Sequence, residues 1–212
     1  MNYLNSQDIN IKEIVRNLYD FSQSGVISIQ NVLTPRALKD LQKAAHLNTH
    51  LFREVLYNEG TAEQQMSTLY FDKVPQEAIA LESLPILSQL RLEYHPIYQS
   101  LAKEAQFKED DFNKMGFHRY QAGSLGITTH QDYERHINLI SIFNIAGNTP
   151  FYYCKDEHAI HACEIDSSPG SLILLRAARD ESEQRYRPFH SVGKVNAMRL
   201  SLNIRTRRYP YP

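Results

Sequence analysis

The sequence contains no tryptophan and only two cysteines among its 212 residues, and its net charge at pH 7 is −1. Two cysteines, Cys154 and Cys163, are too few for the disulfide framework of a small secreted domain, so we expect free thiols. A net charge close to zero provides no global field that would attract a polyanion. Binding of nucleic acid is therefore not expected, although a local basic patch would permit it.

Long apolar runs are also missing. The sequence has no uninterrupted apolar stretch of about 18 residues, the length that a membrane-spanning helix needs. Residues 1–20 are polar and amphipathic and lack the apolar stretch of a signal peptide. We therefore expect no membrane association and a cytoplasmic location. The apolar fraction of 42% is enough to form a core, and the length suits a single domain, residues 1–212.

No linker rich in proline, glycine or serine divides the chain, yet the pattern of its residues changes near residue 113. Residues 1–112 are predicted to form a helical support region. Apolar residues recur at helical spacing over residues 11–21 and 34–45, and the second of these stretches opens with Thr34 as N-cap followed by a proline. A third helix is expected over residues 85–105.

Three stretches of this first half are less regular. Pro96 lies inside the third helical pattern and is expected to kink or split that helix. Residues 25–33, "GVISIQNVL", are rich in β-branched residues and predict a short strand. The polar stretch of residues 56–73 is expected to connect two helices, either as a lid over a site or as a plain exposed connection.

Residues 113–208 show short strand-like runs separated by turn residues. The seven candidates are "GFHRYQ", "GITTHQD", "INLISIFNI", "PFYYCK", "GSLILLR", "HSVGK" and "MRLSLNIRTR". No helical pattern lies between them, so a parallel α/β sheet is excluded and a β-sandwich or barrel is favoured. The fold class expected is mainly β with a helical N-terminal part (α+β), a jelly-roll core with helices packed on one face.

A possible metal site lies in the stretch "GITTHQDYER", residues 126–135, which includes the second candidate strand. Side chains at positions i and i+2 of a strand share a face, so His130 and Asp132 can point together into the barrel. His190, in "RPFHSVGK", is a candidate third ligand. Two imidazoles and one carboxylate leave three positions of an ion open, as in non-haem Fe(II) oxygenases. A zinc hydrolase can use the same set, so the residues alone leave the metal undecided.

The last strand adds a polar stripe. In "MRLSLNIRTRR", Arg199, Ser201, Asn203 and Arg205 alternate with leucine and isoleucine. A guanidinium that points into an apolar barrel is costly unless it meets a carboxylate, whose two oxygens match its planar fork. We therefore expect an acidic ligand close to this strand.

Taken together, these motifs resemble the pattern of the Fe(II)/2-oxoglutarate-dependent oxygenase superfamily. The pattern consists of H-x-D, a distal histidine and, about ten residues later, an arginine. It is matched over roughly residues 113–208 by "HQD", "FHSV" and "MRLS". The R-x-S form is similar to that of isopenicillin-N-synthase-like enzymes, and "RLSLNIR" also resembles the signature of AlkB-type demethylases. The family's upstream N-x-Y is matched at Tyr120, whereas His118 replaces its asparagine.

The resemblance implies a double-stranded β-helix core of the cupin-like type, residues 113–208, and a set of cofactors. Fe(II) is expected on His130, Asp132 and His190, with 2-oxoglutarate and O2 as co-substrates. The residues expected to bind 2-oxoglutarate are Arg199, Ser201, Tyr120 and Arg205. The implied activity is hydroxylation of a small molecule with release of succinate and CO2, and the aspartate ligand argues against halogenation.

Two other functions stay open. One is an AlkB-like oxidative demethylase or hydroxylase acting on nucleic acid or protein, which "RLSLNIR" and the basic, aromatic tail "RTRRYPYP" favour. The other is a jelly-roll module that binds metal or ligand without turnover, which only the His118 departure supports. For the substrate we expect contacts from His118, Tyr133 and Arg135, the last of which would favour an anion.

Overall fold

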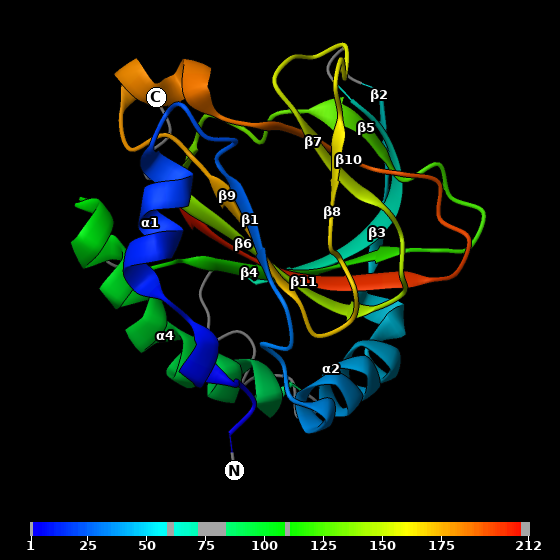
Figure 1. Ribbon diagram of the computed structural model, residues 1–212. Coiled ribbons are helices and arrows are strands. Elements are labelled where there is room, and N and C mark those ends of the chain that lie inside the picture. The colour runs from blue at the N-terminus through cyan, green and yellow to red at the C-terminus, as the bar shows by residue number, and fades with distance from the viewer. Residues whose placement is uncertain (1, 59–61, 72–83, 109–110, 209–212) are drawn as a thin grey trace.

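The computed structural model describes residues 2–58, 62–71, 84–108 and 111–208 (Figure 1). The α-helices are α1 (Ile11–Tyr19), α2 (Pro35–Leu47) and α4 (Pro85–Ala105), and short 3-10 helices occupy Ser6–Asp8, Thr49–Leu51 and Glu181–Tyr186. The strands are β1 (Val26–Ile29), β2 (Arg53–Asn58), β3 (Glu63–Phe71), β4 (Lys114–Tyr120), β5 (Ile127–His130), β6 (His136–Ala146), β7 (Phe151–Cys154), β8 (Cys163–Ile165), β9 (Leu172–Arg176), β10 (Phe189–Val192) and β11 (Arg199–Arg207).

All named strand pairs are antiparallel and form one strongly curved sheet. The strand order is β1-β9-β6-β11-β4-β3-β5-β10-β7-β8, and β2 pairs with β3 beside this path. The first and last strands in this order lie close together. The Ser28 hydroxyl of β1 donates a hydrogen bond of 2.7 Å to the carbonyl of Asp166, just after β8. The result is a nearly closed barrel (Figure 1). The predicted jelly-roll fold is confirmed, and each of the seven strand candidates after residue 113 contains a strand.

The stretch of residues 56–73 differs from the expectation of a connection between helices. Its described part belongs to strands β2 and β3, and β3 pairs with β4 in the main sheet. The first half of β3 alternates between exposed and half-buried residues. These positions carry polar residues, and for this reason the composition of the hairpin resembles that of a loop. Residues 59–61, 72 and 73 lie outside the described residues.

The predicted helices form for local reasons that the sequence carries. The Thr34 side chain accepts a hydrogen bond from the Ala37 amide at 3.2 Å, with Pro35 at the first helical position, as expected for α2. Helix α4 is one unbroken element, so Pro96 does not split it. The backbone bond that a proline removes is the one to Leu92, a residue on the exposed side of the helix, where water can satisfy the carbonyl.

Helices α1, α2 and α4 lie together along one side of the sheet (Figure 1). Alternation along β11 shows how the core is divided. Leu200, Leu202 and Ile204 join the larger apolar cluster between sheet and helices. A second cluster, which includes Ile140, Ile142 and Phe151, fills part of the barrel interior. The intervening polar residues of β11 are therefore buried inside the barrel. None of the described helices is long and apolar enough to cross a membrane.

Candidate metal and co-substrate site

The sheet brings the two histidines of the predicted metal site together. His130, at the end of β5, is the register partner of His190 on β10. Their ring centroids are 4.4 Å apart. Asp132 follows two residues after His130, and its Oδ2 lies 3.4 Å from Nε2 of His190. His190, which is distant in sequence, thus meets the H-x-D segment at one place in the barrel.

Backbone carbonyls fix which nitrogen of each imidazole is available. Nδ1 of His130 lies 2.8 Å from the Thr128 carbonyl, and Nδ1 of His190 lies 3.4 Å from the Pro188 carbonyl. A carbonyl oxygen only accepts, so Nδ1 carries the proton in both rings and Nε2 presents a lone pair. Burial lowers the pKa of His190 to about 3, which keeps its ring neutral. Neutral imidazoles held through Nδ1 by carbonyls are typical of metal ligands.

The carboxylate of Asp132 adds a second unsatisfied acceptor. Its Oδ2 is buried, has no hydrogen-bond partner among the described residues and faces the lone pair of His190 Nε2. Two facing lone pairs repel each other, and a cation between them would remove that repulsion. The donor set therefore fits a divalent cation. Within the described part of the chain, however, no three His, Cys, Asp or Glu side chains are drawn together as tightly as a bound ion would hold them.

Asp132 is instead compensated by basic side chains. Its Oδ1 forms an ion pair with Arg205 at 3.1 Å and lies 3.5 Å from Nδ1 of His136. Burial alone would raise the pKa of Asp132, but the Arg205 guanidinium holds it well below its usual range. The carboxylate is therefore ionised at neutral pH, as a metal ligand must be.

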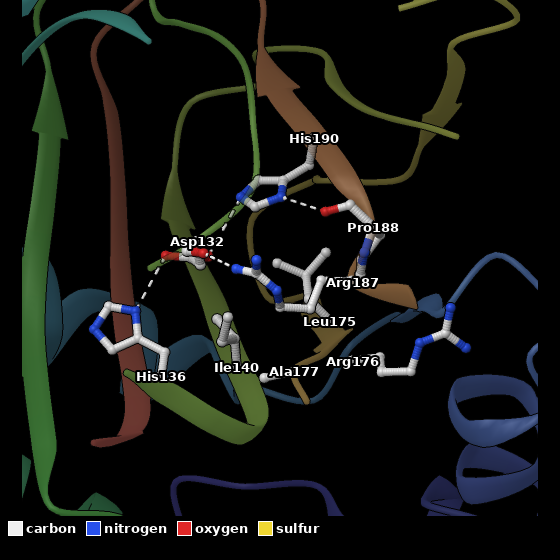
Figure 2. A pocket seen from close by; sticks show the side chains of 9 residues that line it. All are labelled: Asp132, His136, Ile140, Leu175, Arg176, Ala177, Arg187, Pro188 and His190. Atoms are coloured by element: carbon white, nitrogen blue, oxygen red, sulfur yellow. Dashed lines mark hydrogen bonds and ion pairs between the residues drawn. The ribbon is translucent and has the colours of Figure 1, made fainter. Parts of the chain in front are cut away.

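A pair of reciprocal hydrogen bonds ties the two ligand-bearing segments to each other. The Gln131 side chain donates to the Arg187 carbonyl at 2.6 Å, and the Arg187 guanidinium donates to the Asp132 carbonyl. Figure 2 shows Arg187, His190 and His136 converging on Asp132 from three directions. We call these reciprocal bonds the Gln131–Arg187 bridge. It holds the H-x-D segment against the segment that leads into His190.

The start of β11 carries a different kind of buried cation. Arg199 is only 3% exposed, and its guanidinium donates to Oδ1 of Asn144 at 2.7 Å and to the Ser201 hydroxyl at 3.4 Å. Among the described residues no carboxylate lies within ion-pair distance of it, and burial lowers its pKa. The Tyr120 ring lies beside the guanidinium, with the carbon atom Cζ of Arg199 5.7 Å from the ring centroid. These are the groups that a dicarboxylate needs.

The three predicted substrate contacts fall into two locations. His118 is buried inside the barrel, where its Nε2 and the Tyr70 hydroxyl form a hydrogen bond. Tyr133 and Arg135 lie in the segment between β5 and β6. Tyr133 is 51% exposed, and the guanidinium of Arg135 lies over its ring at 4.6 Å. Their contact with a substrate remains a prediction.

Sequence reasoning missed four residues of the site. Asn144 and Tyr70 contact the arginines of β11, and His136 and Arg187 contact Asp132. Only two of them left a signal in the sequence. Asn144 follows Ile140 and Ile142 in the alternation of β6, and His136 stands four residues after Asp132. Tyr70 and Arg187 could not be placed without the pairing of the strands.

Comparison with known proteins gives a likeness in structure but not in sequence. No family model matches the chain, and no curated protein matches its sequence. A prolyl hydroxylase from Trichoplax adhaerens, solved with a peptide of hypoxia inducible factor, has a TM-score of 0.67 and 13% identity over 93% of this chain and 90% of that one. A Pseudomonas putida prolyl-4-hydroxylase has a TM-score of 0.62 and 14% identity, covering 92% and 99%.

A third match comes from a plant. Dioxygenase for auxin oxidation 1 from Arabidopsis thaliana, in a complex with 2-oxoglutarate, has a TM-score of 0.62 and 15% identity over 95% of this chain and 90% of that one. Identities this low establish the fold alone. The likeness nevertheless spans nearly the whole length of each protein, helices as well as barrel. This chain has the fold of the Fe(II)/2-oxoglutarate-dependent oxygenases.

Proposed function

We propose that the protein is a non-haem Fe(II)- and 2-oxoglutarate-dependent oxygenase that hydroxylates a small molecule. The observation that carries this proposal is the meeting, inside one barrel, of two neutral imidazoles and an ionised carboxylate with unsatisfied lone pairs. A buried guanidinium with no acidic partner among the described residues lies on a neighbouring strand. His130, Asp132 and His190 would hold the metal. Arg199, Ser201 and Tyr120 would hold the far carboxylate of 2-oxoglutarate.

The metal and 2-oxoglutarate, when bound, would supply the oxidising chemistry. In that chemistry O2 is reduced, 2-oxoglutarate becomes succinate and CO2, and one oxygen atom enters a substrate C–H bond. The chain provides position and charge. Arg199 offers two N–H groups in a plane, and Asn144 fixes the orientation of that plane through a 2.7 Å hydrogen bond. Arg205 keeps Asp132 ionised, and the carbonyls of Thr128 and Pro188 keep the lone pairs of both imidazoles available.

The apolar side of the barrel interior has a second role. Ile140, Ile142, Phe151 and Val192 are buried beside the polar residues and exclude bulk water. A dry site strengthens every electrostatic contact within it and protects reactive species from side reactions. The reaction itself would be carried by the bound metal and co-substrate, and the chain would only have to bind and orient them.

The test has two stages. Calorimetry with the redox-inert ion Mn(II), followed by 2-oxoglutarate, is expected to show one metal site and a co-substrate that binds only to the metal-loaded protein. Asp132→Ala should abolish metal binding, and Glu157→Gln, at an exposed acid, should leave it intact. The Fe(II)-loaded protein is then screened anaerobically against small molecules and exposed to O2, with succinate release as the readout. Failure to bind either metal or 2-oxoglutarate would end the proposal.

Two alternatives are distinguished by the same screen. A module without turnover would bind metal and 2-oxoglutarate but release no succinate with any compound. An enzyme acting on nucleic acid would bind single-stranded oligonucleotides with a steep salt dependence. The tail that favoured this second alternative ends in residues 209–212, which lie outside the described residues.

A further inference from the structure

Strand register places four basic side chains on the inner face at one end of the barrel. Lys114 on β4 is the register partner of Arg205 on β11. Two residues further along, Arg207 is the partner of His136 on β6. Register partners in antiparallel strands share a face of the sheet, and Arg205 and His136 both reach Asp132 inside the barrel. Three neighbouring strands thus point basic groups into the same end, which we call the basic end.

One of these groups has unmet hydrogen-bonding capacity. His136 is 5% exposed, and in the described part of the chain neither ring nitrogen has a hydrogen-bond partner, although Nδ1 lies 3.5 Å from Asp132. Figure 2 shows Nε2 on the ring edge that faces away from Asp132. A buried polar group without a partner lowers the stability of the folded protein, so native structures rarely keep one without a reason. A ligand group that reaches Nε2 would supply the missing bond.

The charges of the barrel interior decide the sign of that ligand group. The proposed Fe(II) and 2-oxoglutarate cancel each other, and Asp132 cancels Arg205. Arg199 then leaves the interior with an excess of positive charge, because no described carboxylate pairs with it. Lys114 and Arg207 add cationic groups at the basic end, but the count does not depend on them. An excess positive charge in a water-poor interior favours an anionic substrate.

Space beside His136 is limited in the present arrangement. A cavity on the Asp132 side of His136, lined also by Ile140, Leu175 and His190 but not by Arg207 or Lys114, has a volume of about 10 Å³. That is room for about one water molecule. This cavity is too small for a carboxylate or phosphate, so a ligand group would have to approach Nε2 from the opposite edge of the ring.

We propose that the basic end is a subsite for an oxyanion group of the substrate, with His136 and Arg207 as its direct contacts and Lys114 at its edge. This inference rests on the proposed oxygenase function and deepens it by naming a substrate class: small molecules that carry a carboxylate or phosphate. His136 and Arg207 would set the specificity, and neither takes part in binding 2-oxoglutarate.

The experiment uses the Mn(II)-loaded full-length protein saturated with 2-oxoglutarate. The probes are inorganic phosphate, benzoate and the neutral analogue benzamide, and the readout is paramagnetic broadening of their NMR signals by Mn(II). Broadening by phosphate and benzoate, at least about 10-fold greater affinity for benzoate than for benzamide, and retention of 2-oxoglutarate are expected. His136→Phe and Arg207→Gln should each weaken anion binding by about 10-fold.

Three controls make the outcome decisive. Arg53→Gln, at an exposed position, should change nothing. Lys114→Gln, at a partly exposed position, is the variant to use if the other two fail to fold, and it should weaken anion binding by a smaller factor. Unchanged 2-oxoglutarate affinity in each variant shows that the co-substrate site is intact. Absent 2-oxoglutarate binding in the unaltered protein would instead refute the proposed function.

Several results would overturn the subsite while leaving the oxygenase proposal standing. One is 2-oxoglutarate binding with no broadening of any anion. Equal binding of benzoate and benzamide would remove the role of charge. Displacement of 2-oxoglutarate by phosphate would place the anion at Arg199 instead. Full anion affinity in His136→Phe, Arg207→Gln and Lys114→Gln would place it outside the basic end.

Discussion

Two arginines of strand β11 are buried inside the same barrel but meet opposite surroundings. Arg205 forms an ion pair with Asp132 at 3.1 Å, and although burial opposes it, that carboxylate raises the pKa of Arg205. Among the described residues, Arg199 has the neutral partners Asn144 and Ser201 and no carboxylate, and burial lowers its pKa. Two arginines on the same face of one strand thus differ in their counter-charge. A carboxylate of the chain balances the charge of Arg205, and no described carboxylate balances that of Arg199.

This difference separates a positioning role from a binding role. A buried charge that the chain itself compensates needs nothing further, and its loss exposes the partner that it leaves behind. A buried cation with neutral partners weakens the free protein and gains its compensation only when an anion arrives. We therefore predict that Arg199 binds an anionic ligand, whereas Arg205 compensates the charge of Asp132.

The largest effect is expected from Arg205→Gln in the metal-free protein. The substitution leaves Asp132 buried without its cation, which should lower the free energy of unfolding by about 3–5 kcal/mol. Arg199→Gln removes an uncompensated charge and should leave the stability unchanged or slightly raised. Urea denaturation of the two variants measures the contrast. Equal losses in both would contradict the distinction between them.

A double substitution isolates the ion pair in that experiment. Asp132→Asn combined with Arg205→Gln removes both charges, so it should be more stable than Arg205→Gln alone. Mn(II) should also restore part of the stability of Arg205→Gln, because a divalent ion beside Asp132 replaces the missing charge. Neither recovery is expected for a residue whose only role is packing.

A second effect concerns 2-oxoglutarate affinity. Arg199→Gln removes two charge-assisted hydrogen bonds to the far carboxylate, so calorimetry on the Mn(II)-loaded protein should show a loss of about 100-fold. Arg199→Lys should recover only part of it, since a point charge does not reproduce the planar fork. Arg53→Gln, at an exposed position, is the matched control. A loss below about threefold in Arg199→Gln would exclude this arginine as the anchor.

The barrel and the polar stripe of β11 were both predictable from the sequence. Short strands of alternating polarity predicted the jelly roll. In the last strand the same alternation predicted that Arg199 and Ser201 lie on a polar face, opposite an apolar one. Strands β2 and β3 were not predictable, because the exposed half of β3 carries polar residues that also suit a loop. Pairing with β4, a contact distant in sequence, decides their structure.

Partners of the site residues were harder to predict than the residues themselves. Nothing in the sequence distinguishes Arg205, which faces Asp132, from Arg199, which faces Asn144, since both lie on the same polar stripe. Only the register of β11 against β4 and β6 decides which acid or amide each one meets. Register is set by the whole barrel, so the sequence supplied the groups but not their pairing.

The Gln131–Arg187 bridge gives a smaller prediction. Arg187→Met removes the donor to the Asp132 carbonyl and loosens the segment that precedes His190, so Mn(II) affinity should fall by about 10-fold. At saturating Mn(II) the affinity for 2-oxoglutarate should stay within about twofold, because the bridge does not touch Arg199. Arg185→Met, two residues away and exposed, should leave both affinities unchanged. A loss confined to 2-oxoglutarate would contradict this role.

The smallest effect concerns His118 on β4, which is the register partner of Ser201 in the polar stripe of β11. Burial, aided by the Arg205 charge, holds the pKa of His118 well below its ordinary value. The unfolded chain regains a pKa of about 6.5, so below that pH it binds a proton that the folded protein refuses. The contribution of His118 to stability is therefore lost as pH falls through about 6.5 and below, by up to about 1.4 kcal/mol per pH unit.

His118→Asn introduces the residue of the oxygenase pattern. In the metal-free protein it should reduce the slope of the unfolding free energy against pH between about pH 5 and 6.5, while the other buried histidines keep part of that slope. The matched control His158→Asn replaces an exposed imidazole and should leave the slope unchanged. An unaltered slope in His118→Asn would mean that this imidazole accepts its proton inside the folded barrel, against the positive charge of the neighbouring arginine.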